Sequence, residues 1–498
     1  MTIPAPASSI ISALPPEMSL AATTSTGKFN VAARRHPVYL ANEKQWQFFQ
    51  LSYDGGKDYV ATPGNLKKHP FEKPLFYDQR LARAYFYNYC APIVDGIVNH
   101  LFKGGVMRKG AENLADLYAN VNGEEDDIDT FMRSAATGAC CYGKINVLID
   151  MPKMAPEEKQ AVEDGRATRV LDRGKTPRLY LYSPLQLLDW SKSEDGWNWV
   201  LLTHIERTAD NPNIPATQKA VYQLWNRQGW TKYDQAGVIL DDGEHGLGVV
   251  PFVQMANIGV DRNSCGKSTI KDIALINNAI FNWCSLLDEI LYRQTFSQLT
   301  VEGEAKEYDA QAMSTAGAFC YPLNRKPPAF ISPDASQAEL LMKQIDSSIK
   351  ELYRIANIKI GDDKNRNYKT VIENEYDFES FNSVLKNMAR SCEKFETDIH
   401  QILAAWLKND GLRAVKIQYP AEFDITSLSQ DVEEAEKISG LGMGKPFMEM
   451  YKRSIVKKRF PDLDEDALNK ISAGFVEPAV EKNPSRSSDA RSSSDVIS

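Results

Sequence analysis

The sequence lacks the features of a secreted, metal-binding or membrane-spanning protein. Its 498 residues contain seven cysteines, two of them the adjacent Cys140 and Cys141, but no Cys-x-x-Cys pair. This pattern supports neither a disulfide framework nor a zinc site, so a reducing compartment is expected. The N-terminus has no basic segment followed by an apolar core, and no apolar run approaches the ~18 residues of a membrane span. We therefore expect a protein made and kept in a cytoplasm.

An excess of positive charge is also missing. Lys and Arg total 58 against 66 Asp and Glu, which gives a net charge of −8 at pH 7. A sequence-specific nucleic-acid binder usually carries a broad basic surface, so any contact with DNA must be local. With 43% hydrophobic and 25% charged residues the composition is that of a globular protein. The length allows about two to four domains.

Catalytic motifs are scarce. Gly266-Lys267-Ser268 ends like a phosphate-binding loop, but Asp261 stands where that loop needs its first glycine. We interpret the segment as the turn that starts a helix. None of the six histidines has a spacing that puts two metal ligands on one helical face, and no Gly-x-Ser-x-Gly motif is present. The sequence therefore predicts no enzyme activity, no cofactor and no metal.

The acidic run Glu124-Glu125-Asp126-Asp127 leaves one alternative open. Such a cluster could hold a divalent ion for nuclease or nucleotidyl-transfer chemistry. A solvated helix start explains the same residues, because negative charge is favourable at a helix N-terminus. We favour the helix start and keep a metal-dependent nuclease as an alternative.

Two long helices separated by a compact polar segment organise the chain. The first begins at a capping signature, Thr269 with Asp272, and the second at a capping box, Ser336 with Glu339. The two apolar stripes that follow are Ile270, Ile273, Ile280, Leu287 and Leu291, then Leu341, Ile345, Ser348, Leu352 and Ile355. Each helix would be roughly 30 Å or more long at ~1.5 Å per residue. One small core cannot cover both from end to end, so a partner surface is implied.

A flexible arm and two helices are expected at the start of the chain. Residues 1–35 are rich in Pro, Ala, Ser and Thr without apolar periodicity, as in a flexible arm. Tyr77–Lys103 is predicted as one helix, kinked at Pro92, and Glu124–Gly138 as a second helix. The face predicted for the first helix carries Tyr85, Tyr89, Ile93, Val94, Ile97 and Leu101.

Strand patterns follow these helices. The predicted strands are Lys144–Asp150, Arg178–Trp190, Trp197–Glu206, Ala220–Tyr233 and Val249–Asn257. A charged excursion, residues 152–175, and turn clusters such as Asp241-Asp242-Gly243 separate them. We predict one antiparallel sheet packed on the preceding helices. We interpret its tryptophans as core and interface rather than as a base-stacking platform: Trp190, Trp197, Trp199, Trp225 and Trp230.

The C-terminal part of the sequence is predicted to be largely helical. From Phe378 to Trp406 apolar residues alternate strictly at threes and fours, the pattern of a narrow seam packed on another helix. Gly411 is predicted to end this helix, Ala414–Tyr419 to form a strand, and Asp431–Ala473 to form short helices broken by glycine and proline. From about Glu477 the chain has little apolar content and is predicted to be disordered.

The order of these elements resembles the portal proteins of tailed bacteriophages. Arg178–Trp190, ending Tyr-Ser-Pro-Leu-Gln-Leu-Leu-Asp-Trp, is similar to the wing segment of one portal group, and Gly266–Leu299 is similar to its first stem helix. The resemblance covers most of residues 75–475 and rests on topology and loose similarity, not on an invariant motif. It implies an α+β, mainly helical fold with an antiparallel wing sheet, long stem helices, a small α/β clip and a helical crown.

The resemblance also divides the chain into regions. In order they are an arm (1–35), a wing (36–265), a first stem helix (266–296), a clip (297–334), a second stem helix (335–358), a tunnel loop (359–369), a long wing helix and strand (370–424), a crown (425–475) and a disordered tail (476–498). In the clip, Gln298–Glu302 and Ala318–Tyr321 would be strands around a short helix, Tyr308–Ser314. Portals often carry a small-residue turn after the tunnel loop, where this chain has Asn367-Tyr368-Lys369-Thr370.

The resemblance implies a ring, expected to be a dodecamer, at one vertex of a capsid. The ring would assemble in the host cytoplasm, remain in the virion, and form the channel for DNA packaging and ejection. Its implied partners are other copies of itself, double-stranded DNA bound without sequence specificity, terminase, a head-tail adaptor, and capsid and scaffolding proteins, with no membrane. Terminase, and not this chain, would hydrolyse ATP. A metal-dependent phage nuclease and a helical scaffold or adaptor without a channel stay open as alternatives.

The tunnel loop is one candidate contact site. It carries Lys359, Lys364, Arg366 and Lys369 against Asp362 and Asp363, so its local charge is 4 − 2 = +2. In a ring such a loop would repeat around the axis as a collar that contacts DNA phosphates. A solvated surface linker is the plainer interpretation.

The clip contains the second candidate site. Asn324, Arg325 and Lys326 precede Pro327-Pro328, whose fixed backbone angles stiffen the segment. At the far end of the hairpin these residues could meet a packaging motor or an adaptor. A rigid solvated turn is the alternative interpretation.

Overall fold

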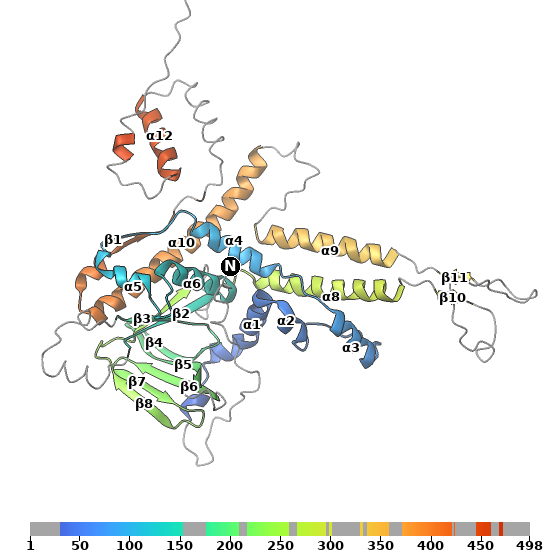
Figure 1. The fold of residues 1–498 in the computed structure, drawn as a ribbon, viewed down its shortest axis with the longest axis horizontal. Coiled ribbons are helices and arrows are strands. Elements are labelled where there is room, and N and C mark those ends of the chain that lie inside the picture. The colour runs from blue at the N-terminus through green and yellow to red at the C-terminus, as the bar shows by residue number, and fades with distance from the viewer. Residues whose placement is uncertain are drawn as a thin grey trace, which may run out of the picture. The chain divides into compact units, whose positions relative to one another are not determined.

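The computed structural model describes residues 30–152, 176–208, 217–257, 266–294, 298–300, 329–331, 336–357, 371–420, 423, 445–459 and 468–471. The chain forms two units, residues 1–423 and 424–498. The first mixes helices with antiparallel sheets (Figure 1). In the second, α12 (Lys445–Arg459) lies within the region predicted to form short helices. None of the described helices is long and apolar enough to cross a membrane.

Six α-helices precede the two larger sheets in the described part of the chain. They are α1 (Pro37–Asp54), α2 (Gly56–Ala61), α3 (Pro74–Arg83), α4 (Cys90–Leu101), α5 (Ala115–Ala119) and α6 (Ile128–Tyr142). Buried residues of α1, α4 and α6 meet in the main core, which also takes residues from the sheets and the later helices.

The prediction of one helix over Tyr77–Lys103 is wrong, because α3 and α4 are separated by a non-helical segment that starts at Ala84. Pro92 is the third residue of α4. Proline has no N–H and fits the first turn of a helix, where that N–H would have no partner, but not the interior. Tyr85 therefore does not share the buried face formed by Ile93, Val94 and Ile97, and it is exposed.

The second helix starts later than predicted. Asp127 is the N-cap of α6, and its carboxylate accepts a hydrogen bond from the Thr130 N–H at 2.7 Å. Glu125 has a φ of 69°, which a right-handed helix does not allow. The helix ends at Gly143, whose φ of 87° forms a left-handed cap. The acidic run thus lies before the helix and not inside it.

The predicted single sheet is two sheets. In the three-stranded sheet, β2 (Lys144–Asp150) lies between β3 (Arg178–Tyr182) and β9 (Phe252–Ala256), with both neighbours antiparallel. The five-stranded sheet is an antiparallel meander of β4 (Leu187–Ser193), β5 (Gly196–Thr208), β6 (Thr217–Asn226), β7 (Gly229–Tyr233) and β8 (Ile239–Glu244). The predicted strand at Lys144–Asp150 is confirmed residue for residue.

Local turns explain why two predicted strands are each divided. Between β3 and β4, Ser183 and Gln186 close a turn through a 3.0 Å backbone hydrogen bond around Pro184, which cannot donate to a sheet. Between β6 and β7, the Asn226 side chain accepts from two backbone N–H groups of the next turn. The Asp241–Gly243 cluster, predicted as a turn, lies within β8. Trp225 is buried in the core beside this meander, as predicted.

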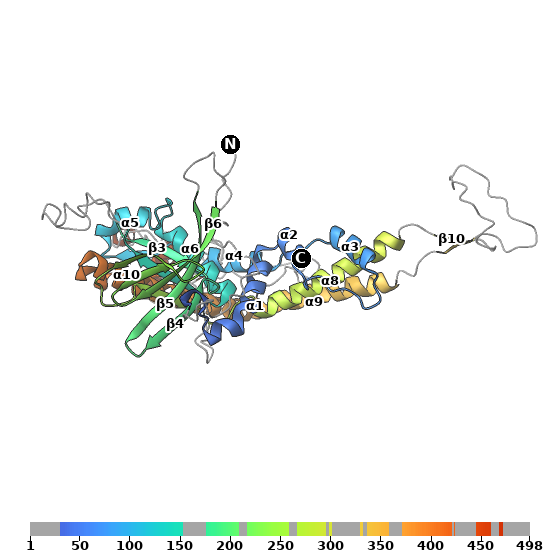
Figure 2. The same ribbon diagram turned by 90° about the horizontal axis from the view of Figure 1, so that it is seen from below.

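The two hairpin helices are confirmed. They are α8 (Lys271–Gln294) and α9 (Ser336–Ile355), and they lie side by side (Figures 1 and 2). Beyond them, β10 (Gln298–Thr300) pairs antiparallel with β11 (Ala329–Ile331). β10 falls within a predicted strand, whereas β11 was not predicted. The predicted strand Ala318–Tyr321 and helix Tyr308–Ser314 lie outside the described residues.

The long helix α10 (Val371–Leu407) confirms the predicted seam, since Leu385, Met388, Cys392, Phe395 and Ile399 are all buried. It packs on α4 and α6, but also on strands β2 and β9. The helix ends at Leu407 and not at Gly411, which lies in the following short helix, Asp410–Ala414. β12 (Lys416–Gln418) then pairs antiparallel with β1 (Met107–Lys109). The five described cysteines are free and buried.

Candidate oligomer interface on the helical hairpin

The base of the hairpin is fixed by a close backbone approach. A Cβ on Gly143 would lie 2.0 Å from the Gly266 carbonyl oxygen, so neither position has room for a side chain. The Ser268 hydroxyl donates to the Cys141 carbonyl at 2.6 Å, and the Thr269 N–H donates to the Cys140 carbonyl at 2.9 Å. Gly266-Lys267-Ser268 therefore attaches the start of α8 to the end of α6. Sequence reasoning placed a helix-start turn here but missed its contact with Gly143.

Helix α3 holds the middle and outer part of α8 through two arginines (Figure 2). The Arg80 guanidinium is buried and binds both Glu72 oxygens at 2.9 and 2.8 Å, while it also donates to the Ser285 hydroxyl at 3.0 Å. The hydrogen bonds from Arg80 lower the pKa of Glu72. One side chain therefore links α3, the segment before it and α8.

Arg83 makes the second, more exposed contact. It forms ion pairs with Asp288 and Glu289 of α8, and its guanidinium carbon lies 4.0 Å from the centre of the Tyr292 ring. Neither arginine was recognised in the sequence, because their partners on α8 are more than 200 positions away.

Helix α9 is covered along one face. The predicted stripe is the less exposed side, with Leu352 fully buried and Ile345 packed against the main core. The Tyr353 ring lies edge-on to the Tyr89 ring at 6.1 Å. Leu340, 70% exposed, and Met342, 45% exposed, stand one position before and one after Leu341, so they flank the covered face on its two sides. The hairpin thus covers one face of α9 and leaves apolar side chains exposed at its flanks.

Helix α8 also presents leucines. Leu275 is 60% exposed and Leu286 is 39% exposed, and their separation of 11 residues is about three helical turns, which places them on one side. Leu291, predicted to belong to the buried stripe, is 49% exposed. Clusters of exposed apolar side chains on a soluble domain mark interaction surfaces. The hairpin is therefore the candidate interface, and its chemistry is that of a protein contact.

A buried polar network joins β1, α6 and α10. The Arg108 guanidinium of β1 binds the Glu396 carboxylate of α10 and lies 2.8 Å from Asp129 of α6. The Tyr419 hydroxyl donates to Glu396 at 2.8 Å. Burial by itself lowers the pKa of Arg108, but the hydrogen bond and charge of Glu396, together with Asp129, outweigh burial and raise it. Arg108 therefore stays charged at every accessible pH.

His400 and Tyr118 extend this network. The Glu396 carbonyl accepts from His400 Nδ1 at 2.7 Å, and Nε2 then accepts from the Tyr118 hydroxyl at 2.5 Å. This pairing corresponds to a neutral imidazole with its proton on Nδ1. Burial lowers the pKa of His400 and raises that of Tyr118, so both groups are neutral near pH 7.

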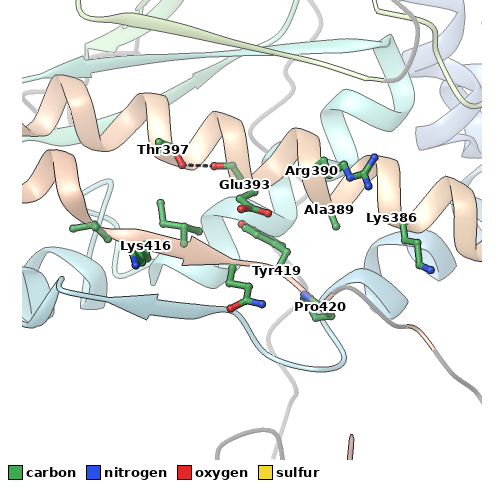
Figure 3. Close-up of a pocket in the computed structure, with 11 residues that line it drawn as sticks. Lys386, Ala389, Arg390, Glu393, Thr397, Lys416, Tyr419 and Pro420 are labelled. Carbon is green, nitrogen blue, oxygen red and sulfur yellow. Dashed lines mark hydrogen bonds between the residues drawn. The ribbon is translucent and has the colours of Figure 1, made fainter.

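A groove of about 700 Å³ lies between α10 and β12 (Figure 3). Lys386, Arg390 and Lys416 stand around it with Glu393, and Tyr419 points into the space between the helix and the strand. Of the residues that line it, Lys386, Arg390 and Lys416 are exposed, whereas Ala389 and Ile417 are buried. The groove has no preorganised polar centre that would identify a ligand.

The acidic run has a local structural use. Asp127 caps α6, and the Asp126 carboxylate accepts from the Asn122 amide at 2.7 Å. Within the part of the chain that the structure describes, no group of three or more His, Cys, Asp or Glu side chains could hold a metal ion.

The residues predicted as contact sites are not among those described. Lys359, Lys364, Arg366 and Lys369 of the tunnel loop lie in the undescribed stretch 358–370, and Asn324, Arg325 and Lys326 lie in 301–328. The structure brings the flanking elements together, because β10 and β11 pair and α8 and α9 pack along each other.

Comparisons with known proteins give a limited answer. No family and no curated protein matches the sequence. Among solved structures, the chain is similar to one from the neck of an empty gene transfer agent particle, with 9% identity over 70% of this chain and 83% of that one, at a TM-score of 0.36. A chain from the virion of a native gene transfer agent particle gives 9% identity over 70% and 84%, at a TM-score of 0.37. Scores of this size do not establish a shared fold.

Proposed function

We propose that this chain is the subunit of a portal ring, a virion component at one capsid vertex through which double-stranded DNA is packaged and ejected. The observation that carries the proposal is the α8–α9 hairpin, whose helices expose Leu275, Leu286 and Leu340 instead of burying them in the chain's own core. The sequence resemblance to tailed-phage portals supports the same assignment independently of this exposed surface.

Ring closure is the physical reason for such a hairpin. When identical subunits are arranged about an axis, a heterologous contact between two different faces repeats until the ring closes. One hairpin would then place its exposed leucines on the neighbouring hairpin, and each helix would be covered on both sides. The attachment of α8 to α6 at Gly143 and Gly266, and to α3 through Arg80, would keep every hairpin at the same angle.

In this ring the undescribed segments take the roles expected from the sequence. Lys359, Lys364, Arg366 and Lys369 would contact DNA phosphates in the channel. Asn324, Arg325 and Lys326 would meet the packaging motor or an adaptor at the far end of the hairpin. A net charge of −8 on each chain suits a channel wall along which DNA slides without adhering.

The decisive experiment images the purified full-length chain by negative-stain electron microscopy and measures its mass by light scattering. A closed ring with a central hole is the expected result. Only monomers or dimers across a wide range of concentration and salt would contradict the proposal. A compact oligomer with no hole would instead favour a scaffold or adaptor.

A separate assay addresses the nuclease alternative. Magnesium-dependent cleavage of DNA that disappears in the Asp126→Ala or Asp127→Ala variant would favour that function. A far-ultraviolet circular dichroism spectrum of each variant serves as the folding control, because Asp127 also caps α6.

A further inference from the structure

A second groove, of about 720 Å³, runs beside the three-stranded sheet. All five residues of β9, Phe252–Ala256, line it. Because successive side chains of a strand point to opposite faces of a sheet, a groove lined by five consecutive residues follows the edge of the strand. Among the described strands β9 pairs with β2 alone. This β9 groove therefore lies where a further strand of the sheet would lie.

The register of β9 shows which of its backbone groups face the groove. Just before the strand, the Pro251 carbonyl accepts from β2 at 2.9 Å, and just after it the Asn257 N–H donates to the Gly143 carbonyl at 2.8 Å. In an antiparallel pair every second residue exchanges hydrogen bonds with its partner, so the odd-numbered residues of β9 bond to β2. Gln254 and Ala256 therefore direct their N–H and C=O groups away from β2, toward the groove.

Two walls enclose the β9 groove. Helix α10 supplies one wall, which includes Phe395 and Ile402, and the β4–β5 hairpin supplies the other, which includes Trp197. The Trp197 ring lies edge-on to the Phe252 ring, with the ring centres 5.3 Å apart. Several peptide-binding domains add an extended peptide to an exposed sheet edge and hold its alternate side chains in pockets. The walls of this groove offer apolar contacts for such side chains.

The charged residues of the groove are unequal in number. Lys192, Arg227 and Lys394 line it against Asp195 and Asp398, in a chain whose net charge is −8. Burial raises the pKa of Asp398, while the charges of Lys394 and Lys192 oppose that rise. Two cations, one from each wall, thus approach one carboxylate, and an incoming carboxylate would balance the second cation.

We propose that an extended, acidic segment of a partner protein binds in the β9 groove as a fourth strand of this sheet. Its backbone pairs with Gln254 and Ala256, because each residue of a peptide supplies one donor and one acceptor. An apolar side chain packs against Trp197, and a carboxylate binds Lys192 and Lys394. Backbone pairing gives the affinity, and the side chains select the sequence.

A library of random peptides displayed on beads supplies the probe. The purified full-length chain is the bait, and the peptides that bind it are then synthesised. We expect these peptides to alternate apolar with other residues around a glutamate or an aspartate. A library that gives no binder, or binders without an acidic residue, would contradict the proposal.

Residue-resolved hydrogen exchange shows whether a selected peptide adds to the sheet. Binding should slow exchange of the Gln254 and Ala256 amides at least tenfold. The amides of Val253 and Met255, which already bond to β2, should keep their rates. Unchanged rates at Gln254 and Ala256 would show that the peptide binds without pairing to β9, which would overturn the assignment.

A matched pair of charge reversals tests the preference for acidic peptides. Lys394→Glu should weaken binding of the selected peptide at least tenfold. Lys386→Glu changes an exposed lysine of the same helix that lines the other groove, and should leave the affinity unchanged. Both lysines are exposed, so both variants should keep the natural unfolding midpoint. Equal losses of affinity would mean that the net charge of the chain, and not this groove, attracts the peptide.

A comparison without peptide distinguishes a partner protein from a second copy of this chain. Exchange at Gln254 and Ala256 is followed in the natural chain and in a variant that carries both Leu275→Glu and Leu340→Glu, which should form smaller species. Equal rates are expected. Slower exchange in the natural chain would assign the groove to a neighbouring copy and overturn the assignment to a partner. Peptide binding is measured in the same way whether or not the chain forms a ring.

Discussion

Arg108 and Glu396, 288 positions apart in the sequence, form a buried ion pair between β1 and α10. Glu396 is fully buried, and Arg108 is shared with Asp129 of α6. Because taking two charges out of water is costly, the pair is stable only as long as each charge keeps its partner. The contact fixes the long helix to a strand that belongs to neither of the larger sheets.

Removing one partner should therefore destabilise the chain. We expect Glu396→Ala to leave the Arg108 charge buried beside Asp129 alone and to lower the free energy of unfolding by about 3 to 5 kcal/mol. Urea denaturation followed by tryptophan fluorescence measures the change. The exposed pair Glu351 and Arg354 supplies a control, because Glu351→Ala should not shift the midpoint. Equal midpoints for Glu396→Ala and the natural chain would contradict this role.

Acid should weaken the fold through histidines that are buried or partly buried. Burial lowers the pKa of His36, His204, His245 and His400 in the folded state below the value of 6.5. The unfolded chain then binds protons more readily, so stability is lost as the pH falls through 6.5 and continues to fall until the folded-state pKa is reached.

Thermal unfolding at several pH values from 7.5 to 5 measures this effect, and the midpoint should decrease over that range. In His400→Gln the dependence on pH should be shallower, because one of the titrating groups is gone and the amide can still accept from Tyr118. A slope unchanged by this substitution would show that His400 does not contribute.

The two arginines of α3 should differ in their effect on stability. Arg80→Ala removes a buried guanidinium that binds Glu72, Ser285 and a backbone carbonyl, and should cost about 3 kcal/mol. Arg83→Ala removes a partly exposed pair and should cost less than about 1 kcal/mol. Hydrogen exchange should show faster opening of α3 in Arg80→Ala alone. Similar losses of unfolding free energy in the two variants would contradict the expectation that Arg80 contributes more than Arg83.

Leucines on the hairpin should control assembly without affecting the fold of the subunit. Leu275→Glu and Leu340→Glu place a charge on exposed positions and should convert the oligomer to smaller species with the unfolding midpoint unchanged. Leu40→Glu, at an equally exposed leucine of α1, is the matched control and should still assemble. Mass photometry at fixed concentration compares the three. Intact oligomers in both hairpin variants would place the interface elsewhere.

The tunnel-loop residues should act on DNA and not on assembly. Changing Lys364, Arg366 and Lys369 together to Ala removes three possible phosphate contacts per subunit, so the ring should form while DNA packaging or retention changes and its salt dependence becomes weaker. Packaged length, packaging rate and retention are measured in assembled heads. If packaged length, packaging rate and retention all equal those of the natural protein, the loop must instead lie on the outside of the particle.

The sequence by itself determined the elements whose signals are local. The apolar repeats of α8, α9 and α10 identify each helix, because residues three and four apart share a helical face whatever the rest of the chain does. The short, largely apolar segment Lys144–Asp150 likewise has the bounds of strand β2 in the sequence. The sequence indicated that the hairpin would be exposed only in one way: its two helices are too long for one small core to cover.

Tertiary structure decided which of these faces meet. One predicted sheet became two, because the turn after Tyr182 sends the chain into a different ladder. Nothing near Arg108 in the sequence indicates Glu396, and nothing near Gly143 indicates Gly266, because each contact forms only after the elements have packed. Leu291 has the periodicity of a core residue, yet it remains half exposed. Periodicity determines the face on which a side chain lies, while the packing of distant segments determines whether that face is covered.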